Sequence, residues 1–186
     1  MWKQTRSFIE LNQKTAVVLG AGSIGNEILK RLKAFGVHTI GVSLNPGESE
    51  YEDEGVTPDH VDEVIGRGDF VISSMPETKE TTNFIGEKLI SQMKDGAFVI
   101  NISRGAIVDE DALYAGLKSG KIAGAALDVT KVEPPPQESP LWDCPNVIIT
   151  PHNTFHSDEF FKRLFALLLG NLERYQKGEA LENRLV

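Results

Sequence analysis

The chain has 186 residues, of which 40% are hydrophobic and 25% are charged, so it can bury the core of a globular domain and has no bias typical of a disordered protein. Its 19 basic and 27 acidic residues give a formal net charge of -8, which repels nucleic-acid backbones and anionic membrane surfaces, and we expect neither as a partner. We predict a cytoplasmic protein, because residues 1–10 are polar, no apolar run approaches the roughly 18 residues of a membrane helix, and the single cysteine, Cys144, cannot form an internal disulfide.

Short apolar runs alternate with amphipathic runs along the chain, which is the pattern of a parallel sheet covered by helices. Strands are predicted over residues 15–19, 37–42, 69–73, 97–102, 122–129 and 147–150, which are mostly apolar throughout, as strands buried on both faces are. Apolar residues at helical spacing predict helices over residues 24–35, 60–65, 87–93 and 109–118, the first stopping at Gly36 and the last at Gly120. We therefore predict an α/β fold of the Rossmann type, a doubly wound, mostly parallel sheet with helices on both faces.

The segment between the second and third predicted strands, residues 44–58, is polar and rich in acids. It contains Glu48, Glu50, Glu52, Asp53 and Glu54. Such a run of charges is usually a solvated surface, so the sequence predicts a solvated loop here.

The last segment of the chain is apolar over more than one helical face. Starting at Ser157, a candidate N-cap, and continuing to Tyr175, one face carries Phe161, Leu164, Phe165, Leu168 and Leu172, and the neighbouring residues Phe160, Leu167 and Leu169 widen it. A helix this broadly apolar is buried on more than one side, by its own domain, a second domain or another subunit. We predict one dinucleotide-binding domain over residues 1–186, with a core of about 12–152 and a C-terminal helical segment over 153–186.

A glycine-rich loop, Gly20-Ala21-Gly22-Ser23-Ile24-Gly25, lies directly between the first predicted strand and the first predicted helix. In a dinucleotide site the first glycine permits the tight turn, the second lets the backbone approach the pyrophosphate, and the third lets helix and strand pack closely. The amide groups and dipole of the helix start then attract the phosphates. This spacing also arises by chance in plain glycine-rich turns, but the strand before it and the helix after it favour the dinucleotide site.

The end of the second predicted strand does not decide between NAD and NADP. An NAD site normally offers an Asp or Glu to the ribose about 20 residues after the glycines, and Val42-Ser43-Leu44-Asn45 contains neither. An NADP site would place an Arg nearby, and residues 43–47 contain no Arg or Lys. Because the acid-rich loop would repel a 2'-phosphate, we favour NAD, with Ser43 or Asn45 as a ribose partner, and leave NADP open.

Three later strands end in residues with reactive side chains. Arg104 follows the fourth, Asp128 lies at the end of the fifth with Glu133 after it, and His152 follows the sixth. The carboxyl ends of parallel strands meet at one edge of a sheet, which would gather an Arg, a carboxylate and a His beside the cofactor. Taken singly, Arg104 could be a surface or capping cation, Glu133 a solvated acid and His152 a turn residue, so the case for chemistry rests on the three together.

Several blocks in this order resemble the D-isomer-specific 2-hydroxyacid dehydrogenases, specifically their nucleotide-binding domain, over nearly the whole chain. The block Asn-Ile-Ser-Arg-Gly-Ala-Ile-Val-Asp over residues 101–109 is the most recognisable. The others are residues 10–15, the glycine loop, Pro76 with Thr78 and Thr81, residues 126–129 with 133–134, residues 140–142, residues 146–147, and residues 150–152. Glu77 departs from this pattern, standing where leucine is usual.

The resemblance implies roles for these residues in hydride transfer between a nicotinamide and a small 2-hydroxy or 2-oxo acid. His152 would be the acid and base, Glu133 would hold its ring and favour the imidazolium, and Arg104 would bind the substrate carboxylate. Asp128 would meet the nicotinamide carboxamide, although a loop cap is the simpler interpretation. The remaining cofactor contacts implied are Ser74, Met75 and Pro76, which could also be a plain strand-to-loop turn, together with Thr81, Ile102 and Ser103. His38, His60 and His156 match no family position, and no metal site is predicted.

Two departures from the family pattern bear on function. The family usually has a small residue two places after His152, whereas this chain continues with Asn153-Thr154-Phe155, which predicts a bulkier nicotinamide edge. Relatives also carry a substrate domain of roughly 100 residues before the nucleotide domain, whereas this sequence starts almost where the nucleotide domain starts. We therefore expect an active-site cleft that lacks the wall formed by the substrate domain, at a cost to substrate positioning and water exclusion. The sequence leaves three hypotheses: an NAD-dependent oxidoreductase or its cofactor-binding half, a non-catalytic dinucleotide-binding module that pairs through its C-terminal helix with itself or with a separate chain, or a truncated gene product. We expect a dimer or larger assembly, with a homodimer as the first choice.

Overall fold

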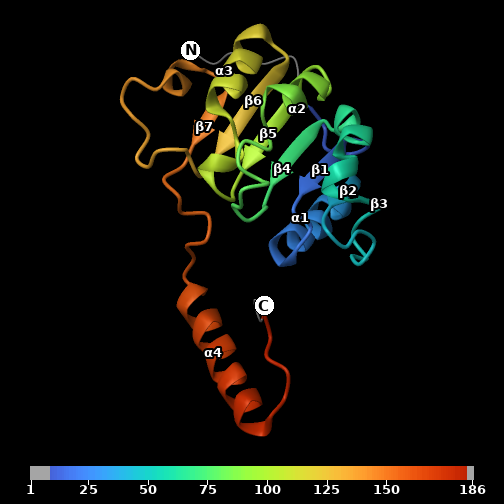
Figure 1. Cartoon of the computed structure of the whole chain (residues 1–186), viewed down its shortest axis with the longest axis vertical. Coiled ribbons are helices and arrows are strands. Elements are labelled where there is room, and N and C mark those ends of the chain that lie inside the picture. The colour runs from blue at the N-terminus through green and yellow to red at the C-terminus, as the bar shows by residue number, and fades with distance from the viewer. Residues whose placement is uncertain (1–8, 184–186) are drawn as a thin grey trace, which may run out of the picture. The chain divides into compact units, whose positions relative to one another are not determined.

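A computed structural model describes residues 9–183 of the chain, and most of the polar start, residues 1–8, therefore lies outside the described residues. Seven strands form one sheet in the order β3-β2-β1-β4-β5-β6-β7, and every pair is parallel (Figure 1). The strands are β1 (Thr15–Leu19), β2 (His38–Val42), β3 (Glu54–Val56), β4 (Phe70–Ser73), β5 (Ala97–Asn101), β6 (Ile122–Leu127) and β7 (Val147–Ile149). The chain runs outward from β1 to β3 and returns to the other side of β1 as β4. This arrangement confirms the doubly wound Rossmann-type fold.

The helices lie where the apolar spacing predicts them, within one or two residues at most ends. They are α1 (Ser23–Ala34), α2 (Glu87–Gln92), α3 (Glu110–Ser119) and α4 (Phe160–Lys177). Asp109 caps α3 because its side chain accepts hydrogen bonds from the amides of Asp111 and Ala112, and Gly120 ends the helix at a φ of 79°. Short 3-10 turns occupy η1 (Pro58–Glu63), η2 (Ile65–Arg67), η3 (Gly105–Ile107) and η4 (Pro140–Asp143).

Both faces of the sheet are covered, and the alternation along β1 shows it. Val17 and Leu19 belong to the larger buried cluster, which takes Leu89 from α2 and Leu113 from α3. Val18 points to the other face, into a smaller cluster with Leu29 of α1 and Ile72 of β4. A strand buried on both faces must be apolar at every position, which is why the predicted strands read as continuous apolar runs.

The acid-rich segment after β2, which we predicted to be a solvated loop throughout, contains a short strand. Glu54–Val56 is β3 and pairs with β2 in the register Ile40 to Glu54 and Val42 to Val56. Its acids are engaged locally: Asp53 accepts hydrogen bonds from the Thr39 amide and hydroxyl, each at 3.0 Å. Glu54 at the end of the charge run therefore lies in the edge strand, whereas Glu48 and Glu50 stay exposed in the loop.

Two helix predictions also need correction. Residues 60–65 form no α-helix but two 3-10 turns, because the segment is short, begins at Pro58 and meets Gly66. Ser157 is not the N-cap of the last helix: α4 begins at Phe160, Glu159 flanks it, and Ser157 contributes its backbone carbonyl to the Phe160 amide at 3.2 Å.

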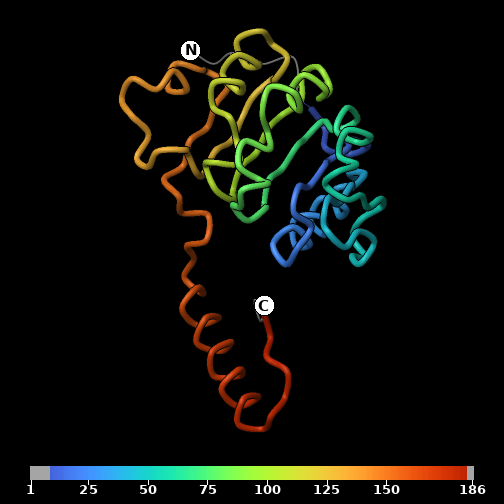
Figure 2. Tube along the Cα trace, in the orientation of Figure 1, coloured from blue at the N-terminus to red at the C-terminus, as the bar shows by residue number. Residues whose placement is uncertain are grey.

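The chain divides into two compact units, one ending at His152 and the other beginning at Asn153. In the second unit Gly178 ends α4 at a φ of 70°, and the tail turns back along the helix, as the trace in Figure 2 shows. There Asn171 and the backbone of Glu182 exchange two hydrogen bonds, at 3.0 and 2.8 Å. No residue of α4 is buried, and Phe161 and Phe165 are 66% and 61% exposed. Within residues 9–183 no helix is both long and apolar enough to cross a membrane.

Candidate cofactor and active site

The glycine loop lies at the point where the chain reverses direction in the sheet, between the ends of β1 and β4. Gly20 has a φ of +93°, and a Cβ there would lie 2.8 Å from the Met75 amide nitrogen. A Cβ on Gly25 would lie 2.2 Å from the Gly20 carbonyl oxygen, whereas a Cβ on Gly22 would meet nothing within 4 Å. Gly22 also flanks the start of α1, where no side chain caps the helix. Two glycines are thus required by packing, and the third faces open space at a helix start that can receive a pyrophosphate.

A cleft of about 610 Å³ extends from this loop along the ends of β2 and β4. Several of the predicted cofactor residues line it together: Gly20, Gly22, Ser43, Asn45, Met75, Pro76 and Thr81. Ser23 and Ile24 lie in the first turn of α1 and are not among the residues that line the cleft. Ser74 serves the cleft indirectly, because its hydroxyl donates to the Gly20 carbonyl at 2.8 Å and fastens the end of β4 to the glycine loop.

The cleft also contains residues that the sequence did not single out, among them Glu48, Glu80 and Phe84. Hydrogen bonds from the Thr78 side chain and from its own backbone amide lower the pKa of Glu80, so this acid is ionised at neutral pH. In the sequence, Glu48 is only one of the five acids of a charged segment. No periodicity or motif marks these positions, and only the way the loop folds over the end of β2 brings Glu48 to the cleft.

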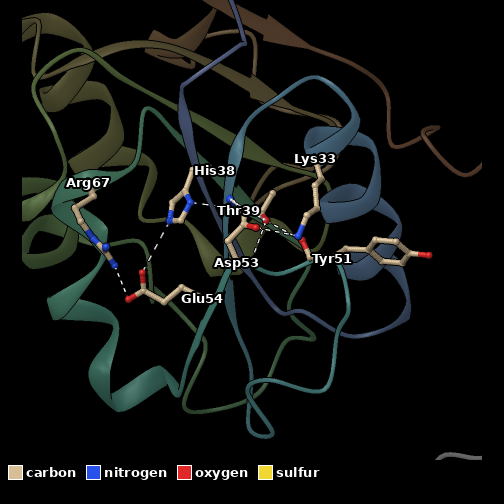
Figure 3. A network of polar contacts seen from close by, with 7 residues as sticks. All are labelled: Lys33, His38, Thr39, Tyr51, Asp53, Glu54 and Arg67. Carbon is tan, nitrogen blue, oxygen red and sulfur yellow. Dashed lines mark hydrogen bonds and ion pairs between the residues drawn. The ribbon is translucent and has the colours of Figure 1, made fainter.

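The network in Figure 3 anchors the loop that carries Glu48 to the start of β2. Lys33 donates to Asp53 at 2.9 Å, and the buried Thr39 donates its hydroxyl to the Tyr51 carbonyl at 2.7 Å. The hydrogen bond from Lys33, followed by that from the Thr39 amide, lowers the pKa of Asp53 to about 2. The acid is therefore ionised throughout the physiological range.

A second part of the same network fixes β3. His38 lies between two acids, 3.6 Å from Asp53 and 4.0 Å from Glu54, and Arg67 donates to Glu54 at 2.7 Å. That bond from Arg67 lowers the pKa of Glu54. These contacts lie at the starts of β2 and β3, at the other end of the strands from the cofactor cleft, and they hold β3 beside β2.

The loop after β5 carries Arg104 and is built on buried hydroxyls. Ser103 is buried, and its hydroxyl shares a hydrogen bond with the Ser73 hydroxyl at 2.9 Å and donates to the side-chain oxygen Oδ1 of Asn101 at 2.8 Å. Arg104 is exposed and donates to the Ser103 carbonyl at 2.7 Å. Ile102, Ser103 and Arg104 line neither this cleft nor the smaller one below. A Cβ on Gly105 would lie 2.0 Å from the Thr130 backbone, so this loop lies directly against the loop that leads to Glu133.

Glu133 and His152 form a direct pair at the ends of β6 and β7. The Nδ1 atom of His152 lies 2.8 Å from Oε2 of Glu133, whose Oε1 accepts the Thr130 amide at 3.2 Å. His152 has a φ of 48°, and its amide donates to the Asp128 carbonyl at 2.8 Å. A non-glycine residue is rarely held in this region of φ, so the backbone of His152 has an uncommon conformation, while its ring is oriented by Glu133.

The pair lines a second cleft of about 360 Å³, together with Asp128, Thr130 and Trp142. Asp128 is buried, and its carboxylate accepts the hydroxyl of Thr150 at 2.5 Å. This contact joins the ends of β6 and β7, and the role of Asp128 towards the nicotinamide carboxamide stays a prediction. The backbone amide of Asp128 also donates to the Asn101 backbone carbonyl at 3.0 Å, which links the ends of β5 and β6.

Comparison with known proteins decides the family. Residues 1–154 match the sequence profile of the D-isomer specific 2-hydroxyacid dehydrogenase, NAD binding domain. The chain belongs to this family. It is 40% identical over 176 residues to D-3-phosphoglycerate dehydrogenase of Methanocaldococcus jannaschii, covering 94% of this chain and 33% of that one. It is 36% identical to glyoxylate reductase of Korarchaeum cryptofilum, covering 91% of this chain and 51% of that enzyme.

Solved structures of the family agree with the fold. A probable 2-hydroxyacid dehydrogenase from Rhizobium etli, solved in complex with NADP, superposes with a TM-score of 0.89 at 29% identity, covering 100% of this chain and 59% of that one. A D-isomer specific 2-hydroxyacid dehydrogenase from Xanthobacter autotrophicus, in complex with NADPH, gives 0.88 at 30% identity and covers 100% of this chain and 75% of that one. The chain spans between a third and somewhat over half of the length of the curated relatives it matches.

Proposed function

We propose that this chain binds NAD(H) at the glycine loop and presents Arg104, Glu133 and His152 for hydride transfer with a small 2-hydroxy or 2-oxo acid. The observation that carries the proposal is the Glu133–His152 pair at 2.8 Å, placed at the same edge of the sheet as the glycine loop. The dinucleotide-binding core covers about residues 12–152. The loop fits a dinucleotide because Gly22 leaves open space beside an uncapped helix start.

The protein's own part in the chemistry is to bind the acid and move one proton. The bound cofactor supplies or accepts the hydride at the carbon that carries the oxygen. Because Glu133 accepts a hydrogen bond from Nδ1 of His152, Nε2 is the atom that gives a proton to the keto oxygen in reduction and takes it back in oxidation. Arg104 would leave the Ser103 carbonyl to bind the substrate carboxylate, a task that suits the fixed donors of a guanidinium.

Turnover tests this proposal. The chain is incubated with NADH and, separately, glyoxylate, hydroxypyruvate or pyruvate, and oxidation of NADH is followed. We expect His152→Asn to lower the rate by roughly 100-fold to 10,000-fold while NADH affinity stays within about twofold. His60→Asn is the matched control, because this exposed histidine contacts only Thr57 and Asp59 among the interactions described for it. A wild-type chain that oxidises no NADH above background at high concentration would refute the catalytic part.

A second function is favoured by α4. Phe161, Phe165, Leu168 and Leu172 are each more than half exposed, and an apolar surface of this extent usually meets another protein surface. The chain would then be a non-catalytic dinucleotide-binding module that pairs through α4. NADH binding without turnover supports this function, and absence of binding defeats both.

Pairing through α4 is expected under either function, as a homodimer in the cytoplasm. Light scattering at micromolar concentration should give the mass of a dimer for the wild type and of a monomer for Leu168→Gln combined with Leu172→Gln. Glu173→Gln, a change at an exposed polar residue of the same helix, should leave the dimer intact. A monomeric wild type would rule the homodimer out.

A further inference from the structure

The cofactor cleft has an uneven charge. Two acids, Glu48 and Glu80, are among the residues that line it, and none of those lining residues is a lysine or arginine. Glu48 belongs to the loop after β2, the strand whose end faces the adenosine ribose in a doubly wound fold. The carboxylate that is absent from residues 42–45 is therefore supplied to the same cleft from a few residues further along the chain.

The loop holds Glu48 in a defined place. Its neighbours on both sides, Gly47 and Ser49, donate their backbone amides to Oε1 of Glu52, at 3.1 and 3.0 Å. Tyr51 donates its amide to the Ser49 hydroxyl at 3.2 Å, and the next residues are fastened to Thr39. A loop that is closed on both sides of one residue presents that residue at little further entropic cost on binding.

Glu52 cannot be the ligand-binding acid, although it lies in the same loop. Its Oε2 atom is buried and has no hydrogen-bond partner, and it lies 2.1 Å from the position that a Cβ on Gly41 would take. The Glu52 carboxylate is thus enclosed between β2 and its own loop. Glu48 is the acid of this loop that reaches the cleft.

We propose that Glu48 accepts the hydroxyl groups of the adenosine ribose and makes this cleft select NAD(H) against NADP(H). This inference rests on the proposed function. A carboxylate can accept hydrogen bonds from both ribose hydroxyls, whereas a 2'-phosphate removes one of those hydroxyls and places negative charge beside Glu48 and Glu80. Solved relatives of about 30% identity contain NADP or NADPH, so the preference is a property of this loop rather than of the fold.

Parallel titrations test the assignment. NADH and NADPH are titrated into the full chain at low salt, with nicotinamide fluorescence as the readout, for the wild type, Glu48→Gln and Glu50→Gln. We expect the wild type to bind NADH at least about tenfold more tightly than NADPH, and Glu48→Gln to reduce that ratio several-fold by weakening NADH and strengthening NADPH. Glu50→Gln is the matched control, because this exposed acid of the same loop does not line the cleft. Its ratio should equal that of the wild type.

The outcomes separate the two proposals. Equal affinities for NADH and NADPH in the wild type, or an unchanged ratio in Glu48→Gln, would overturn the assignment of Glu48 while leaving the dinucleotide site intact. Failure to bind either cofactor would refute the proposed function itself. Raised salt gives an independent check, because screening should reduce the wild-type ratio more than that of Glu48→Gln, in which Glu80 is the one acid left among the residues that line the cleft.

Discussion

Two loops border the cofactor cleft, and they are shaped by different forces. In residues 20–25 the backbone itself is packed: Gly20 and Gly25 have no room for a Cβ. In the loop after β2 the shape comes from side chains that bond to the backbone, chiefly Glu52 to Gly47 and Ser49, and Asp53 to Thr39. Close packing of backbone needs glycine and leaves a visible pattern in the sequence. A side-chain network uses acids that are common on any surface, so it leaves none.

Among substitutions that would test this difference between the two loops, Gly25→Ala is expected to have the largest effect on stability and on NADH binding. A Cβ there would meet the Gly20 carbonyl oxygen at 2.2 Å, so Gly25→Ala must displace backbone. We expect a loss of about 1–3 kcal/mol in the free energy of unfolding, measured by denaturant titration, and loss of NADH binding. An alanine at this position that left both quantities unchanged would show that helix and loop are less tightly packed than the distances imply.

Gly22 provides the matched variant in the same loop. A Cβ there meets nothing within 4 Å, so Gly22→Ala should leave the unfolding free energy nearly unchanged. NADH affinity should nevertheless fall by about tenfold or more, because the methyl group would occupy the space through which the pyrophosphate approaches the backbone. Unchanged affinity, measured by the fluorescence titration used for Glu48, would place the phosphates elsewhere.

The sheet was predictable from sequence because its signals are local. Continuous apolar runs placed six of the seven strands within about two residues, since a strand buried on both faces must be apolar. Gly120 marked the end of α3 for an equally local reason. β3 was missed because three half-buried residues next to acids have no such pattern, and only pairing with β2 makes them a strand.

The candidate site was predictable in part. The resemblance to the family brought Glu133 and His152 together in advance, and the structure places them 2.8 Å apart. It could not place Glu48, because this acid reaches the cleft through the loop's own hydrogen bonds. The sequence also could not predict the orientation of Arg104. Its exposed guanidinium donates a hydrogen bond to the Ser103 carbonyl, and this contact depends on the local conformation of the loop.

The smallest expected effect concerns Asp53, which anchors the side-chain-built loop. Its folded-state pKa is lowered to about 2 by Lys33 first and then by the Thr39 amide, below an unfolded value near 3.9. A lowered pKa means that Asp53 stabilises the fold at any pH well above the unfolded value and loses this contribution as the pH falls from about 4 through about 2. Because solvent screens this partly exposed side chain, Asp53→Asn should cost only about 1 kcal/mol in unfolding free energy at pH 7.

Thermal or denaturant unfolding at several pH values checks this expectation. The difference between wild type and Asp53→Asn should be full at pH 7 and shrink towards zero as the pH approaches 2. Asp95→Asn is the control, because this acid pairs with Lys121 at 2.7 Å with its side chain 89% exposed, where an ion pair contributes little. A loss in Asp53→Asn that does not change with pH would mean that the loop is held by the Thr39 hydroxyl and the β2–β3 pairing, and that the charge of Asp53 has no part in fixing it.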